Sequence, residues 1–177
     1  MAITRIGLNQ SINLASNVTG TLPTANGGTG ATSFTAAKVL QVVTSVPTSS
    51  FSTTSTSLVD TPYSITITPT ATNSKMIVEF SGNWGKGDAT GRNQLQVQTN
   101  SSGSYAAIKT ASYLAWTGSG DTAQGTLDTV RVIESPIGTT NAVTYKLQAK
   151  IISSSQTVYV PLNNNDASLA TVYEIAG

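Results

Sequence analysis

Few side chains in this sequence could perform catalysis. The chain has no histidine and no cysteine, so it cannot build a Ser-His-Asp triad, a Cys-His pair or a zinc site with the usual ligands. Eight carboxylates remain, and a glycosidase needs a pair of them. Glu79, Asp128 and Glu174 fall in segments that we expect to be strands. Their spacing favours no catalytic pair, so we interpret them as outward-facing strand charges and predict no enzymatic activity.

Two glycine-rich segments lack the features of a phosphate-binding loop. Such a loop has Ser or Thr directly after its lysine and runs into a helix. In residues 82–92 Gly87 follows Lys86, and a strand-like segment comes next. Residues 26–30, Asn-Gly-Gly-Thr-Gly, have no clear strand before them. Residues 163–166 lack the acidic repeat of a calcium loop and are expected to form a turn. We therefore predict no cofactor and no metal.

The aromatic residues divide into a core group and a candidate binding group. Trp84 continues the alternation of Met76, Val78 and Phe80, so we interpret it as a core residue. Tyr113 and Trp116 lie beside the glycine-containing residues 117–120. Aromatic side chains in glycine-rich loops can stack on sugar rings, so these two are our candidate receptor contacts.

The charge balance excludes some partners. Charged residues make up 10% of the chain, against about 25% in a typical globular protein. The net charge is +1 and the nine Lys and Arg residues form no run, so we predict no nucleic-acid partner. No segment approaches the roughly 20 apolar residues of a membrane span, and the N-terminus lacks the apolar stretch of a signal peptide. A polar but uncharged surface suits a chain that is buried against copies of itself or against other subunits.

From residue 37 onward the sequence alternates as β-strands do. Tyr63, Ile65 and Ile67 alternate with hydroxyl residues until Pro69 ends the pattern, and residues 142–152 alternate most regularly. We predict an all-β domain over residues 37–177, an antiparallel β-sandwich or jelly roll in which one side of each sheet is polar. The expected strands cover residues 39–44, 63–68, 75–84, 94–99, two short pieces within 105–116, 127–133, 142–152, 157–162 and 169–175, with a Ser/Thr-rich loop or edge at 48–57.

Residues 1–36 are too few to form a core of their own. Their apolar residues are spaced by polar ones, and residues 17–30 combine glycines with a proline, which disfavours both helix and strand. One interpretation is a disordered N-terminus. The other, which we favour, is an extended N-terminal arm that docks on a neighbouring subunit by strand pairing. The candidate anchor and assembly residues are Ile3, Ile6, Leu8, Leu22, Pro23, Gly27, Gly28 and Gly30.

Residues 20–30, Gly-Thr-Leu-Pro-Thr-Ala-Asn-Gly-Gly-Thr-Gly, resemble a Leu-Pro-x-x-Asn-Gly-Gly-Thr-Gly motif of tail-fibre and other virion proteins of tailed bacteriophages. Residues 38–43, 64–78 and 170–177 look like a β-domain that is often found in such proteins, whereas residues 85–140 carry no motif of this kind. The resemblance implies a homotrimeric virion structural protein with β-sandwich heads around a threefold axis. The glycines at 27, 28 and 30 would let three chains approach closely at that axis.

Within that family the short N-terminal segment favours a trimeric capsid-surface protein, either a decoration or cement protein or a short head fibre. Its partners would be itself and other virion subunits such as the major capsid protein, and its location the virion. The alternative is a short tail fibre or receptor-binding protein that recognises a host-surface glycan through loops such as 84–92 and 112–121. A carbohydrate-active enzyme is a distant third hypothesis.

Overall fold

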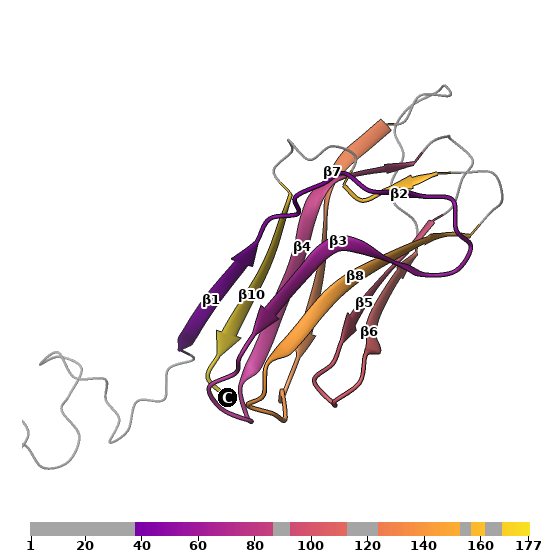
Figure 1. Cartoon of the computed structure of the whole chain (residues 1–177). Helices are drawn as coiled ribbons and strands as arrows, with labels where there is room; N and C mark the ends of the chain where they lie inside the picture. Colours follow the sequence, from indigo (N-terminus) through magenta and orange to yellow (C-terminus); the bar gives the residue numbers. More distant parts are fainter. Residues whose placement is uncertain (1–37, 87–92, 113–123, 153–156, 162–167) are drawn as a thin grey trace, which may run out of the picture. The chain divides into compact units, whose positions relative to one another are not determined.

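The computed structural model describes residues 38–86, 93–112, 124–152, 157–161 and 168–177 (Figure 1). These residues form β-strands and loops, and they contain no helix. The all-β prediction is therefore confirmed, whereas the boundary at residues 36 and 37 stays a prediction. The strands are β1 (Val39–Ser45), β2 (Ser52–Thr53), β3 (Val59–Ile67), β4 (Lys75–Lys86), β5 (Asn93–Thr99), β6 (Ala106–Ser112), β7 (Gln124–Glu134), β8 (Val143–Ile151), β9 (Val158–Tyr159) and β10 (Leu169–Ile175).

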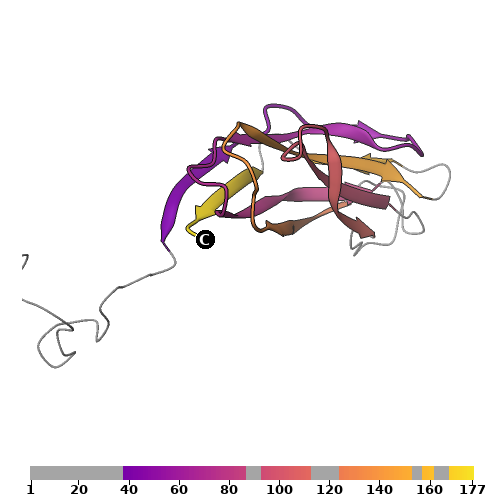
Figure 2. The ribbon, with the colours of Figure 1, turned by 90° about the horizontal axis from the view of Figure 1, so that it is seen from below.

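The described strands form two antiparallel sheets. In sheet A the order is β1-β10-β4, with β7 along the other edge of β4 and the short β9 and β2 continuing beside the far end of β4. In sheet B the order is β3-β8-β5-β6. Seen edge-on in Figure 2, the two sheets lie as two facing layers. Each sheet therefore has an inner face toward its partner and an outer face.

The inner faces meet in one hydrophobic core. Tyr63, Phe80 and Trp84 are fully buried there. The Tyr63 ring packs edge-on against Phe80 and Trp84, with ring centroids 6.0 Å and 5.9 Å apart, which is a favourable geometry for aromatic pairs. The indole N–H of Trp84 donates to the Tyr63 hydroxyl at 3.0 Å, and that hydroxyl donates to the Ser81 carbonyl at 3.0 Å. Trp84 is thus a core residue, as its phase in the sequence indicates.

Strict alternation of apolar and polar residues located the long strands well. In β8 every second side chain, from Val143 to Ile151, is buried. The expectations for residues 105–116 and 157–162 were less accurate. In the described part of the first segment there is one strand, β6, where we expected two short ones, and in the second segment the strand β9 is only two residues long. Proline explains the short β9, because Pro161 has no N–H to extend the ladder. The loop at 48–57 includes the two-residue strand β2.

Glu174 corrects one expectation. We interpreted it as an outward-facing strand charge, but it faces the core side of β10 and is 0% exposed. Its carboxylate accepts hydrogen bonds from the Gln41 side chain at 2.6 Å and from the backbone and hydroxyl of Thr70, both at 2.8 Å. Burial alone would raise the pKa of Glu174, but polar contacts from Ser74, Gln41 and Thr70 outweigh it and lower the pKa to about 2. This carboxylate therefore joins β1, β10 and the loop after β3.

Candidate binding face

The outer face of sheet B carries a polar network that begins at a bulge in β3. The β3–β8 register shifts between Asp60 and Ser64, where Pro62 has no backbone N–H to donate. The Thr61 hydroxyl takes over by donating to the Leu147 carbonyl at 2.8 Å, and it accepts from the Tyr63 N–H at 3.3 Å. Bulges commonly redirect a side chain. Here the bulge lies beside Asp60, which meets two side chains of β8.

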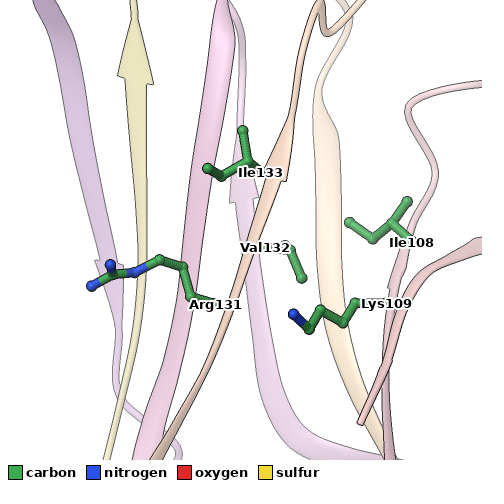
Figure 3. Close-up of a pocket in the computed structure, with 5 residues that line it drawn as sticks. All are labelled: Ile108, Lys109, Arg131, Val132 and Ile133. Carbon is green, nitrogen blue, oxygen red and sulfur yellow. The ribbon is translucent and has the colours of Figure 1, made fainter.

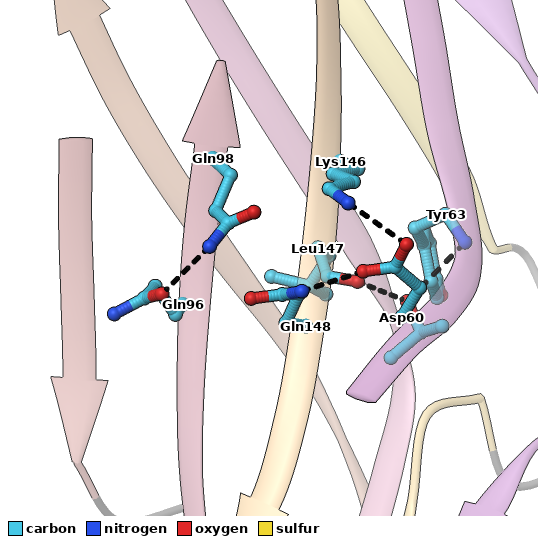
Figure 4. Close-up of polar contacts among 8 residues, drawn as sticks. Asp60, Tyr63, Gln96, Gln98, Lys146, Leu147 and Gln148 are labelled. Carbon is cyan, nitrogen blue, oxygen red and sulfur yellow. Dashed lines mark hydrogen bonds and ion pairs between the residues drawn. The ribbon is translucent and has the colours of Figure 1, made fainter. Parts of the chain in front are cut away.

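Asp60 is the acidic end of this network (Figure 4). Its carboxylate accepts from the Lys146 ammonium at 2.8 Å and from the Gln148 amide at 2.6 Å. Burial alone would raise the pKa of Asp60, but the hydrogen bonds from Lys146 and Gln148 and the charge of Lys146 lower it. The side chain of Asp60 is 54% exposed, so this ion pair contributes little to stability. Its effect is to hold Lys146 and Gln148 in place.

A second set of hydrogen bonds lies on the neighbouring strands of sheet B, where the register places Gln96 opposite Gln148 and Gln98 opposite Lys146. In β5 the Gln98 amide donates to the Gln96 carbonyl oxygen at 3.1 Å, and the Gln96 amide donates to the Thr110 hydroxyl of β6 at 3.2 Å. The Lys146 ammonium, which also contacts Asp60, lies 4.1 Å from the centroid of the Tyr105 ring, a cation–π distance. Asp60, Lys146, Gln148, Gln98, Gln96 and Thr110 form what we call the amide ladder.

The amide ladder can recognise hydroxyl-rich ligands by hydrogen bonding. A glutamine side chain offers two donors and one carbonyl acceptor. The Gln148 carbonyl oxygen is buried and has no hydrogen-bond partner among the residues that the structure describes. The ladder therefore offers hydrogen-bonding groups and little net charge, because its two charged side chains, Asp60 and Lys146, form an ion pair with each other.

A groove of about 370 Å³ lies on the side of the fold where β6 contacts β7. It is lined by Ile108 and Lys109 of β6 and by Arg131, Val132 and Ile133 of β7. In Figure 3 Ile108, Lys109 and Val132 lie toward one another, whereas Arg131 extends away from β6. Arg131 forms an ion pair with Glu79 of β4. The groove is thus apolar at its base with cationic side chains at its rim.

The candidate residues from the sequence lie outside the described part of the chain. This holds for Ile3, Ile6, Leu8, Leu22, Pro23, Gly27, Gly28 and Gly30 and for the proposed receptor contacts Tyr113 and Trp116. Of the loop at 84–92, Trp84 belongs to β4 and is buried. The alternation of residues 94–99 and 142–152 places Gln96, Gln98, Lys146 and Gln148 on the polar side of their strands. It did not indicate the amide ladder, because side chains on different strands become neighbours only once the register is known.

No protein-family model matches the chain, and no curated protein matches it. Among the described residues, no group of three or more Asp or Glu side chains is placed to hold a metal ion. The same residues contain no helix that is long and apolar enough to cross a membrane.

Proposed function

We propose that this protein is a non-enzymatic structural protein of a tailed-bacteriophage virion. In this proposal it forms a homotrimer on the capsid surface, as a decoration or cement protein or a short head fibre. Residues 1–36 form the arm that anchors it to other virion subunits such as the major capsid protein. The observation that carries the proposal is the Leu-Pro-Thr-Ala-Asn-Gly-Gly-Thr-Gly segment at residues 22–30, which precedes an all-β domain that begins at β1.

We further propose that the domain is a jelly roll, and the strand pairing supports this. Among the described strands, eight are longer than two residues. The first of these pairs with the last (β1 with β10), the second with the seventh (β3 with β8), the third with the sixth (β4 with β7) and the fourth with the fifth (β5 with β6). A long hairpin rolled into two sheets has this nested pairing. Jelly rolls occur in viral capsid proteins and lectins, but a fold alone does not assign a function.

Copy number per particle tests the capsid location. A capsid-surface protein occupies hundreds of sites on a virion, whereas a tail component occupies a handful. Gel densitometry of purified particles, calibrated against the major capsid protein, should give a high copy number, and cryo-electron microscopy should place the protein on the head. A few copies per particle would contradict the decoration role.

The amide ladder favours a second candidate, a short tail fibre that binds a host-surface glycan. Its glutamine amides and the Thr110 hydroxyl match the hydrogen-bonding groups of sugars. In this case the purified protein should bind host cells, and both Trp116→Ala and Gln148→Ala should weaken binding. Ile152→Ala, at an exposed position, is the matched control. Absence of cell binding by the unaltered protein would remove this candidate.

A further inference from the structure

The outer face of sheet A carries a row of apolar side chains. The register aligns Val42 of β1 with Tyr173 of β10, Tyr173 with Ile77 of β4, and Ile77 with Ile133 of β7. Val42 is 50% exposed and Ile133 is 62% exposed. These four residues, Val42, Tyr173, Ile77 and Ile133, are defined here as the apolar row. It crosses four strands without a polar interruption.

The rows on either side of the apolar row are mixed. On one side Val39, which is 52% exposed, pairs with Ile175, and Ile175 pairs with the exposed Lys75 of β4. On the other side the next outward row is Thr44, Thr171, Glu79 and Arg131. Glu79 and Arg131 form an ion pair with each other, so they add little net charge to the face. We expected a polar outer side for each sheet, and sheet A departs from that expectation where sheet B, with its amide ladder, does not.

An uncovered face of this kind is unfavourable for a monomer in water. Burying the exposed parts of Val42 and Ile133 against another surface would remove apolar area from water and is therefore favourable. Contiguous apolar patches on soluble proteins commonly mark contact sites. The centre of a protein–protein interface is depleted in charge and enriched in aromatic residues, as the apolar row with its Tyr173 is.

We propose that a second copy of this chain covers the apolar row, so that the outer face of sheet A is the contact between subunits. The row starts at β1, the edge strand of sheet A. Residues 1–37 precede β1 directly in the chain. In the proposed trimer the arms meet at one axis, so β1 is the strand of the domain that is connected most directly to that axis. This inference rests on the proposed function for the number of copies, and it adds the face through which they meet.

The test compares the oligomeric state of full-length variants. Val42→Glu and Ile133→Glu place carboxylates at the two ends of the row, at positions exposed enough for a monomer to tolerate them. We expect each change to raise the concentration at which the oligomer dissociates by at least about 100-fold, because a charge would be buried without a partner. Size-exclusion chromatography with light scattering measures this. Ile152→Glu, at a position that is 45% exposed beyond the end of β8, is the control and should remain oligomeric.

A thiol probe covers the case in which a glutamate variant does not fold. The chain has no cysteine, so Ile133→Cys and Ile152→Cys each introduce a single thiol. In the oligomer, a maleimide reagent should modify Cys at position 152 at least about ten times faster than at position 133. Equal rates in an intact oligomer would overturn the proposed contact face.

The outcomes separate this inference from the proposed function. A trimer that both glutamate variants leave intact overturns the contact face but not the trimer. A protein that is monomeric at every concentration contradicts the trimer itself. If it is monomeric and the glutamate variants unfold at lower temperature than Ile152→Glu, the chain's own arm covers the row and the contact between copies is excluded.

Discussion

Gly82 occupies a position where no side chain fits. A Cβ atom there would lie 2.0 Å from the Tyr63 hydroxyl and 2.8 Å from the Ser168 hydroxyl. The Tyr63 hydroxyl cannot move freely, because it links Trp84 to the Ser81 carbonyl. Glycine in a strand often marks a place where another group approaches closely. Gly82 lies in the interior of β4, within the segment 75–84 that the sequence predicts to be a strand.

We predict that Gly82→Ala lowers the free energy of unfolding by about 2–4 kcal/mol, because overpacking and a disturbed buried hydrogen bond act together. Urea denaturation measures the change. In a Tyr63→Phe background the clashing hydroxyl is absent, so the cost of Gly82→Ala should fall. An equal cost in both backgrounds would show that the hydroxyl is not the obstacle.

Glu174 makes stability depend on pH in the acid range. Its pKa is lowered from 4.5 to about 2 in the folded chain, so its ionised form stabilises the fold. This contribution is complete above the unfolded pKa and is lost as the pH falls from about 5 to 2. The shift corresponds to about 3 kcal/mol.

Glu174→Gln should therefore be less stable than the unaltered chain at pH 7, by on the order of 2–3 kcal/mol. It should also flatten the dependence of stability on pH between 5 and 2. Urea titrations at several pH values give both results. Glu79→Gln, which removes an outward-facing ion pair with Arg131, is the control and should cost less than about 1 kcal/mol.

At the scale of elements, the bulge in β3 connects backbone geometry to the amide ladder. Thr61→Val keeps the shape of the side chain but removes the donor to the Leu147 carbonyl. We expect a loss of about 1–2 kcal/mol in unfolding free energy. We also expect a weaker coupling between Asp60 and Lys146 in a double-mutant cycle. Thr66→Val removes an exposed hydroxyl contact with Thr144 and should cost less, so equal losses would argue against a special role for Thr61.

The strands were the most predictable part of the fold, because alternation is a local signal. In β3, β4 and β8 the apolar phase alone identified the buried side chains correctly. Pairing is not local. The Gln41–Glu174 hydrogen bond joins residues 133 positions apart, so the burial of Glu174 could not be read from its neighbours in sequence. The apolar row was missed for the same reason, since its four members belong to four strands.

At the scale of the whole molecule, the arm and the β-domain have separate roles in the proposed function. A chain that starts at Ala36 keeps every strand that the structure describes. We predict that it folds with unfolding cooperativity unchanged, but that it is no longer incorporated into particles. Complementation of a phage lacking the full-length protein, followed by gel analysis of the virions, measures this. Normal incorporation of the shortened chain would contradict the anchoring role.

The glycines of the arm allow a more specific test of how the arm contributes to trimer assembly. We predict that replacing Gly27, Gly28 and Gly30 together with Ala weakens trimer assembly and incorporation, since Cβ atoms would prevent close approach at an axis. Light scattering and gel analysis of virions are the measurements. Replacing Ala25, Ala31 and Ala37 with Ser is the matched control, because it changes the same stretch without affecting glycine. Unchanged assembly of the triple alanine variant would exclude the close approach.

The position of β10 has a consequence for synthesis. β10 is the last described strand in chain order, yet it lies between β1 and β4 and pairs with both. A ribosome adds residues at about 5–20 per second, so β1 waits on the order of 10 s for its partner. During this time the arm is already outside the ribosome while the β-domain is still incomplete. A nascent chain that stops before Leu169 leaves one edge of β4 without its partner strand, and unpaired strand edges are prone to aggregation, so chaperones and proteases would act on this chain before it assembles.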